Sequence, residues 1–342
     1  MAEILTRRDR IYKVLAFEEV DRVPRHLWAL PGVTHDRPQE MQAFRERFPQ
    51  DDISGVPAIL AASGRASGDP NRRGTYTDDW GCVWDVLEDG IIGEIKKPIL
   101  ADDALLDAYV PPFEITDNAD ISPVAPYRAE HPDEFLLMGG INFFERMQYL
   151  RGTEQLFIDL AMDDPIAYKL RDMVHEYNLR VFRLMAQCDV DAISIFDDWG
   201  SQRSLLISPE MWRAFFKPCY REYCDIICSS GKKVFFHSDG FIEAIYPDFI
   251  EMGVNALNSQ LFCMDMEKLG REYADKIVFW GEIDRQYLMP FGTPDEIRAG
   301  VRRAAKALMP HGKRTGVVAQ CEWGIKDPLE NVLAVYDEWD KV

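Results

Sequence analysis

The sequence lacks long apolar runs and is short of basic residues. It contains no stretch of about eighteen consecutive apolar residues, which a membrane-spanning helix needs, so no such helix is expected. Lys and Arg number 39 against 58 Asp and Glu, which gives a formal net charge of −19. Nucleic acids and anionic membrane surfaces are bound through clustered basic side chains. The composition therefore argues against both kinds of partner.

A secretion signal and a disulfide framework are also missing from the pattern. Residues 1–25 carry neither the apolar core nor the small-residue cleavage site of a signal peptide, and their pattern is that of an amphipathic helix. The seven cysteines are odd in number and scattered, which is not typical of paired disulfides. Cys219, Cys224 and Cys228 fall within one helical segment, where buried free thiols are favoured over a metal site. We therefore expect a cytoplasmic protein.

From about residue 133 onward, short β-rich runs alternate with amphipathic helical segments. Cap residues followed by proline mark three helix starts, at Ser208-Pro209, Thr293-Pro294 and Asp327-Pro328. This alternation predicts a parallel sheet flanked by helices. The predicted strands span residues 135–141, 192–199, 233–240, 255–261, 277–284 and 315–323.

Residues 1–130 are irregular and rich in proline, glycine and aspartate. They are predicted to contain one barrel strand at 22–28, followed by an excursion of loops and short strands in which 75–86 forms a hairpin or lid. No glycine-rich phosphate-binding motif follows any strand, which argues against an open nucleotide-binding sheet. We predict an α/β fold: a single (β/α)8 barrel of the TIM type spanning 1–342, with regular β/α repeats over 131–342.

Reactive side chains stand at the ends of the later predicted strands. In a (β/α)8 barrel the C-terminal ends of all strands face one mouth, so these residues are expected to meet there. Capping of the following helix explains one acid at a strand end more easily than acids at four strands. The residues are Asp197 and Asp198, His237 and Asp239, Asn258 and Gln260, Glu282 and Asp284, and Cys321 and Glu322.

His237, Asp239 and Cys321 are the predicted metal ligands. Residues two apart on a strand lie on one face, so His237 and Asp239 can reach one ion. Three such ligands with an open fourth position are typical of catalytic zinc. The alternative is that Cys321 packs in the core and Asp239 caps the next helix.

Asp198 and Glu282 are the predicted catalytic residues, each as a proton donor or a fourth ligand. Aromatic and acidic side chains around the same mouth suit a large flat ligand. Core filling explains the tryptophans equally well. The predicted substrate-binding residues are Asp197, Trp199, Trp280 and Glu322.

Several of these motifs together resemble the uroporphyrinogen decarboxylase superfamily. The resemblance runs from about residue 133 to the end, and more loosely through 75–86 and 22–28, and it implies a distorted (β/α)8 barrel. That superfamily includes decarboxylases of tetrapyrrole synthesis and zinc-dependent methyltransferases that act with corrinoid proteins or thiols. The segments that carry it are FDDWGSQRSLLISPEMWRAFFKPCYREYCDII (196–227), GKKVFFHSDGFIEAIYPDFIEMGVNALNSQ (231–260), IVFWGEID (277–284) and KDPLENVLAVYDEW (326–339).

Two departures separate the chain from parts of that superfamily. The decarboxylases carry an arginine-rich N-terminal motif that grips substrate carboxylates, whereas residues 26–38 here read HLWALPGVTHDRP. The methyltransferases bind zinc through His-x-Cys and a later Cys. Here His237 and Cys321 match that pattern, but Asp239 replaces the first cysteine. A site with fewer thiolates is harder, which suits polarisation of a methoxy or hydroxyl oxygen.

The resemblance thus implies a methyltransferase that moves a methyl group between a small methoxy-type substrate and a corrinoid protein, with zinc as Lewis acid. A partner would supply the corrinoid, since the chain shows no cobalamin-binding domain, and the resemblance also allows a homodimer. One alternative is a cofactor-free decarboxylase or lyase acting on a small acid or a tetrapyrrole, in which Asp198, His237 and Glu282 move protons. Another is a barrel that binds a ligand or a corrinoid partner without turnover.

Overall fold

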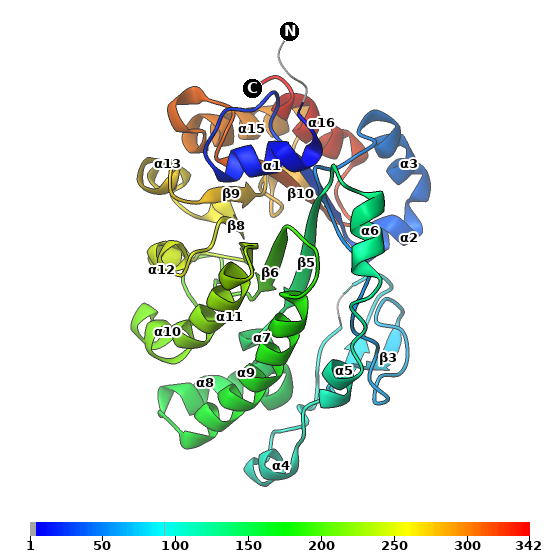
Figure 1. Cartoon of the computed structure of the whole chain (residues 1–342), viewed down its shortest axis with the longest axis vertical. Coiled ribbons are helices and arrows are strands. Elements are labelled where there is room, and N and C mark those ends of the chain that lie inside the picture. Colours follow the sequence, from blue (N-terminus) through cyan, green and yellow to red (C-terminus); the bar gives the residue numbers. More distant parts are fainter. Residues whose placement is uncertain (1–4, 92) are drawn as a thin grey trace.

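The computed structural model describes residues 5–91 and 93–342, and within them eight parallel strands form a nearly closed barrel (Figure 1). The predicted (β/α)8 barrel of the TIM type is therefore confirmed. The strands, in order around the sheet, are β1 (Arg25–Ala29), β10 (Val317–Trp323), β9 (Val278–Gly281), β8 (Ala256–Ser259), β7 (Lys233–Ser238), β6 (Ala192–Phe196), β5 (Phe135–Ile141) and β2 (Ile53–Ser54).

Helices follow the strands and flank the barrel (Figure 1). In the described part of the chain, none of them is long and apolar enough to cross a membrane. They are α1 (Arg7–Leu15), α2 (Pro31–Asp36), α3 (Pro38–Arg47), α4 (Asp103–Ala108), α5 (Phe113–Asp117), α6 (Val124–Glu130), α7 (Phe144–Arg151), α8 (Thr153–Ala161), α9 (Pro165–Met185), α10 (Pro209–Phe215), α11 (Lys217–Ser229), α12 (Tyr246–Glu251), α13 (Met266–Tyr273), α14 (Leu288–Phe291), α15 (Pro294–Leu308) and α16 (Leu329–Trp339).

Two of the three predicted helix starts are confirmed. Ser208 and Thr293 cap α10 and α15, because their hydroxyls accept backbone N–H groups of the first turns. The third prediction is shifted by one residue: α16 begins at Leu329, with Pro328 in the capping position.

The N-terminal excursion contains the predicted hairpin. Strands β3 (Gly74–Thr77) and β4 (Val83–Val86) pair antiparallel within it. Figure 1 shows this hairpin, together with α4 and α5, on the side of the molecule away from α13 and α15. The excursion thus covers one flank of the barrel and leaves the regular β/α repeats on the other.

Side chains on each barrel strand alternate between the inside of the barrel and the layer beneath the helices. Ala192 and Phe235 belong to the inner cluster, where Ile11 of α1 packs against them at the N-terminal end of the barrel. Their neighbours Ile193 and Val234 belong to the outer cluster, shared with the helices. Because both faces are buried, the strands are apolar almost throughout.

The barrel closes through Asp52, next to β2. Its backbone N–H donates to the carbonyl of Arg25 in β1 at 2.8 Å, and its carboxylate accepts the N–H of Arg25 at 2.7 Å. The same fully buried carboxylate pairs with Arg10 at 2.6 Å and with Arg22 at 2.7 Å. One side chain therefore joins the first two strands and the helix beneath them.

We expect Asp52→Ala to lower the free energy of unfolding by about 3–5 kcal/mol, because it removes the buried carboxylate that pairs with Arg10 and Arg22 and accepts the backbone N–H of Arg25. Urea denaturation followed by circular dichroism measures the change. Asp295→Ala is the control, since Asp295 pairs with Arg298 at a site where its side chain is 93% exposed, and such pairs contribute little. Equal stability losses in the two variants would contradict this assignment of the closure.

Candidate functional site

Polar residues occupy the inner face at the C-terminal ends of neighbouring strands. The register pairs Phe196 of β6 with His237 of β7, and His237 with Asn258 of β8. Asp198 and Asp239 each follow two residues later, so the alternation brings them to the same side of the wall. The backbone N–H of Asp239 also donates to Oδ1 of Asp198 at 2.9 Å. Residues from separate strands therefore meet at the mouth of the barrel.

Asp198, His237 and Asp239 form a cluster that can hold a metal ion. One ligand atom from each lies within 4.8 Å of the others, and all three residues are partly buried. Nε2 of His237 lies 3.4 Å from Oδ1 of Asp198 and 3.8 Å from Oδ1 of Asp239. Three protein ligands are the number that catalytic zinc sites use.

A hydrogen-bonded chain beneath the cluster fixes the orientation of His237. Its Nδ1 lies 2.6 Å from Oδ1 of Asn258. The amide nitrogen of Asn258 donates to the backbone carbonyl of Trp280 and, at 3.2 Å, to Oε1 of Gln320, so its oxygen faces the imidazole as an acceptor. Nδ1 therefore carries a proton, and Nε2 is the atom left to bind an ion beside the carboxylates.

Crowded carboxylates shift the protonation equilibria of this mouth. Burial raises the pKa of Glu282 to about 8, and the nearby Glu322 and Asp198 add to the rise. Burial alone would lower the pKa of His237, but Asp198 and Glu282 outweigh burial and raise it. Carboxylates this close together can all be ionised only when a nearby cation offsets their charge. Without a cation, one of them keeps its proton. The mouth therefore favours uptake of a cation.

Arg285 is a site residue that the sequence analysis missed. Its guanidinium donates to a carboxylate oxygen of Asp239 and, at 2.6 Å, to Oε1 of Glu322. Its Nε lies 3.6 Å from Oε2 of Glu282. One cation thus offsets part of the charge of three carboxylates. It sits in the loop after β9, where nothing in the strand pattern marks it.

Glu145 on α7 is a second missed residue. Burial and the charge of Asp198 raise its pKa, and the hydroxyl of Tyr149 donates to its Oε1 at 2.8 Å. It lies in the first turn of a helix, whereas all the predicted site residues lie at the ends of strands. It adds one more carboxyl group to the acidic mouth.

Three buried polar atoms at the mouth have no hydrogen-bond partner among the described residues. They are Oδ1 of Asp239, Oε1 of Glu282 and Nε2 of Gln320. Buried polar atoms are nearly always satisfied, so the unpartnered Oδ1 of Asp239, within the Asp198–His237–Asp239 cluster, has room to bind a ligand. One imidazole nitrogen and two carboxylate oxygens suit a divalent cation such as zinc. The residues of the Asp198–His237–Asp239 cluster therefore fit a metal ion.

Cys321, the third predicted metal ligand, lies outside this cluster. Gln320 and Glu322 face into the barrel, which places Cys321 on the outer face of β10. It pairs in register with Leu27 and is buried in the layer beneath the helices. Burial and the charge of Asp327 raise the pKa of its thiol well above the usual value, which disfavours the thiolate that zinc requires.

Asp197 and Trp199, two of the predicted substrate-binding residues, also face outward. The fully buried carboxylate of Asp197 accepts three backbone N–H groups at the start of α7, at 2.7–3.0 Å, and the hydroxyl of Tyr220 at 2.6 Å. Trp199 stacks on Phe144 with ring centroids 4.1 Å apart. Both residues hold α7 and α11 against the barrel.

Trp280 faces into the barrel but is fully buried, so it supports the site from below. Its Nε1 donates to Nδ1 of His26 at 3.1 Å. The ring of Trp28 lies 5.1 Å from that of Trp280 and 5.4 Å from the imidazole of His237, centroid to centroid. Together these rings form an aromatic layer beneath the cluster.

The predicted substrate contact of Glu322 stays a prediction.

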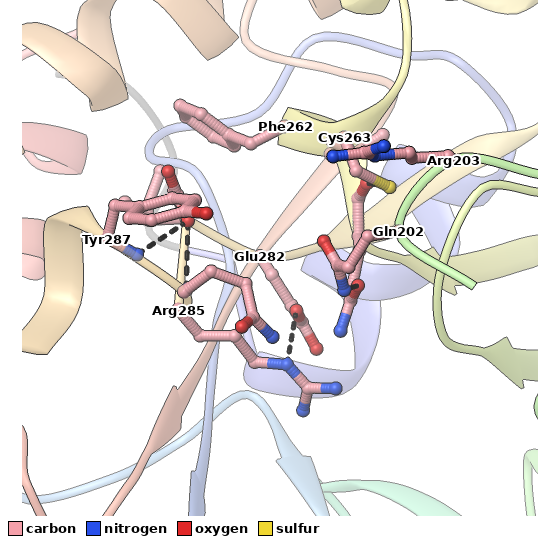
Figure 2. A pocket seen from close by; sticks show the side chains of 12 residues that line it. Gln202, Arg203, Phe262, Cys263, Glu282, Arg285 and Tyr287 are labelled. Carbon is pink, nitrogen blue, oxygen red and sulfur yellow. Dashed lines mark hydrogen bonds and ion pairs between the residues drawn. The ribbon is translucent and has the colours of Figure 1, made fainter. Parts of the chain in front are cut away.

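Arg285 separates two cavities beside the mouth. One, of 430 Å³, is lined by residues that follow β6, β8 and β9, including Gln202, Gln260 and Glu282. Figure 2 shows Glu282 in this cavity between Arg285 and Gln202. The other, of 730 Å³, lies between the N-terminal excursion and the loops after β1, β9 and β10, and Glu322 lines it. Both volumes are typical of small-molecule sites.

Comparison with known families gives the class of protein that this fold and mouth define. The model of the family "Uroporphyrinogen decarboxylase (URO-D)" matches residues 124–342. The chain therefore belongs to the uroporphyrinogen decarboxylase family, as the sequence resemblance predicts.

Individual relatives are distant. Uroporphyrinogen decarboxylases of Chlorobium phaeobacteroides and Pelodictyon phaeoclathratiforme are 25% identical over 180 residues and 24% identical over 185 residues. These matches cover 52% and 53% of this chain and 48% and 49% of the two relatives, so the chain spans about half the length of the curated relatives it matches. A solved structure described as a methyltransferase from Methanosarcina mazei has a TM-score of 0.70 at 16% identity, covering 98% of this chain and 99% of that one. That likeness concerns the fold.

Glu282→Gln should remove a pH dependence from the stability of the ion-free protein. The unfolded chain releases this proton at the ordinary glutamate pKa, whereas the folded protein holds it up to a pKa of about 8. Folding stability therefore falls as the pH rises between those two values. Above about pH 8 the amide variant is expected to be more stable by on the order of 5 kcal/mol, and near pH 4 unchanged. Urea melts across this range measure it, and a variant less stable than the parent at high pH would refute the assignment.

Asn258→Ala should weaken zinc binding about 10- to 100-fold, because the imidazole loses the acceptor that sets its orientation. Competition with a chromophoric chelator measures the affinity. Ser259→Ala is the matched control, since the next residue of β8 faces outward and its hydroxyl pairs with Tyr246 at 2.6 Å. Similar affinities in both variants would show that the hydrogen-bonded chain does not orient His237.

Proposed function

We propose that this protein transfers a methyl group between a small methoxy-type substrate and a corrinoid protein, using zinc held by Asp198, His237 and Asp239. The observation that carries the proposal is the cluster of these three residues at an acidic mouth, with the unpartnered Oδ1 of Asp239 3.8 Å from Nε2 of His237. The shared fold with a solved methyltransferase supports this choice within the family.

The donor set favours an oxygen substrate. Two carboxylates and an imidazole without a thiolate make a hard site, which prefers ether or hydroxyl oxygen to sulfur. Zinc bound there supplies Lewis acidity toward the ether oxygen of the substrate. Asn258 keeps the imidazole in its ligating orientation, and Arg285 holds the second oxygen of Asp239, so that Oδ1 remains available.

Glu282 is the proton donor in this scheme. Its Oε1 is buried without a partner, and the residue lines the 430 Å³ cavity. A pKa raised to about 8 by burial keeps this carboxyl protonated near neutral pH, as a general acid requires. Arg285, 3.6 Å from its second oxygen, stabilises the carboxylate that remains after proton transfer.

In the direction of demethylation, the O–CH3 bond breaks and its electron pair stays on the oxygen. That oxygen takes the proton of Glu282, which solvent later replaces. A reduced corrinoid on the partner protein would accept the methyl group and would supply the electron pair of the new bond. A separate corrinoid protein is the proposed partner, and the formal net charge of −19 argues against a nucleic acid as partner.

The charge of the mouth disfavours decarboxylation of a polyacid. Asp198, Asp239 and Glu322 gather there, with Arg285 as a single counter-charge, so a substrate rich in carboxylates would be repelled. This charge supports methyl transfer over the activity named for the distant relatives.

Zinc-loaded protein is expected to consume cob(I)alamin, followed by its absorbance, when a methoxy donor is added. His237→Ala and Asp239→Ala should lose bound zinc, measured by elemental analysis, and at least about 100-fold of the rate. Cys321→Ala is the control and should keep both, because its sulfur faces away from the mouth.

Methyl transfer that persists after zinc has been removed by a chelator would contradict the proposal. So would release of carbon dioxide from a carboxylic substrate by chelator-treated protein, which is the outcome that a cofactor-free lyase predicts.

A further inference from the structure

We propose, on the basis of the metal site in the proposed function, that Gly200 and Gly240 are positioning residues. The contact between their backbones sets the spacing of the two carboxylate ligands and thereby the affinity for zinc. Gly200 follows Asp198 by two residues in the loop after β6. Gly240 directly follows Asp239 in the loop after β7. The two glycines are called the glycine pair below.

Backbone hydrogen bonds continue between the two loops beyond the ends of their strands. The pairing of β6 with β7 reaches His237. Beyond it, the N–H of Gly200 donates to the carbonyl of Asp239 at 3.0 Å, and the N–H of Phe241 donates to the carbonyl of Ser201 at 2.7 Å. The loops that carry the carboxylates are therefore joined after the ligands as well as before them.

Two further hydrogen bonds connect one ligand to the other. The N–H of Asp239 donates to Oδ1 of Asp198 at 2.9 Å. The N–H of Trp199, the residue after Asp198, donates at 3.0 Å to the hydroxyl of Ser238, the buried residue before Asp239. The position of one carboxylate therefore depends on the position of the other loop.

Both positions of the glycine pair exclude a side chain. Gly240 has a φ of +79°, and a Cβ there would lie 2.6 Å from the Cα of Gly200. A Cβ on Gly200 would lie 2.5 Å from the carbonyl carbon of Gly240. Glycine permits both the left-handed conformation and the close approach of two backbones. The obstructing atoms are backbone atoms that cannot rotate away, so a larger residue at either position forces the two loops apart.

The metal site leaves little room for such a separation. Nε2 of His237 lies 3.4 Å from Oδ1 of Asp198 and 3.8 Å from Oδ1 of Asp239. Zinc binds nitrogen and oxygen at about 2.0–2.2 Å, so two ligand atoms of one ion lie at most about 4.4 Å apart. Loops forced apart by an added Cβ would therefore leave one carboxylate out of reach of the ion.

Gly240→Ala and Gly200→Ala are expected to weaken zinc binding at least about tenfold, an effect typical of changes next to metal ligands. Competition of the full chain with a chromophoric chelator measures the affinity. Gly231→Ala is the matched control, since Gly231 has a φ of +77° and an added Cβ there meets no described atom within 4 Å. It shares the backbone strain of Gly240→Ala without separating the loops, so its zinc affinity should equal that of the parent.

Cobalt(II) in place of zinc gives a readout that a loss of stability alone does not change. A site with three protein ligands and one open position holds a four-coordinate ion. Four-coordinate cobalt(II) absorbs visible light more strongly than six-coordinate cobalt(II). The parent and Gly231→Ala are expected to show the strong bands at saturating cobalt, and Gly240→Ala weak ones, because water replaces the lost carboxylate.

Hydrogen exchange of the parent protein tests the contact without any variant. The hydrogen bonds donated by the N–H groups of Gly200 and Phe241 join protein groups alone. Both amides are therefore expected to exchange at least about 100-fold more slowly than in an unfolded chain, also after zinc has been removed. Exchange at the unfolded rate would overturn the contact, even if the alanine variants fail to fold.

Zinc affinities of Gly240→Ala and Gly200→Ala that equal that of Gly231→Ala would overturn the role of the glycine pair and leave the metal site intact. A parent protein that binds no zinc would overturn the metal site and the glycine pair together. Zinc binding that Gly240→Ala weakens, in a parent that transfers no methyl group, would overturn the proposed methyl transfer and support the glycine pair.

Discussion

The alternation of side chains along closed parallel strands decides which residues of this protein can meet. Every second residue of a strand faces the inside of the barrel, and the closure at Asp52 holds the strands in register. Asp198, His237 and Asp239 share the inner face, and this brings them together from two strands. Cys321 misses the same cluster by a single residue position, because Gln320 and Glu322 hold the inward positions on β10.

The inner face gathers several acidic side chains, and three features of the protein reduce the repulsion between them. Arg285 pairs with acids of separate loops, Glu282 holds a proton to a raised pKa, and His237 presents Nε2 to two carboxylates. An ion at the cluster would add a further positive charge. Acidic side chains are thus concentrated at the place where a metal ion is proposed to bind. Their charge disfavours the binding of substrates that carry several carboxylates.

Much of the fold was predictable because apolar strand segments and amphipathic helical segments alternate regularly along the sequence. The run 135–141 coincides with β5, the other later strands lie within their predicted runs, and the motifs at their ends identified the mouth. The face of each side chain was not predictable, because strands buried on both sides have no polar alternation to show their inward positions. That gap explains why Asp197, Trp199 and Cys321 were expected at the mouth although the structure places them on the outward face. Arg285 and Glu145 were missed for another reason, since they lie in a loop and a helix start and reach the site only through the folded chain.

X-ray absorption at the zinc edge of the metal-loaded protein tests the central claim most directly. Zinc bound by Asp198, His237 and Asp239 gives a first shell of nitrogen and oxygen near about 2.0 Å, with an imidazole signature that His237→Ala removes. A sulfur neighbour at about 2.3 Å would contradict the account, because it would place Cys321 on the side of the strand that the alternation denies it.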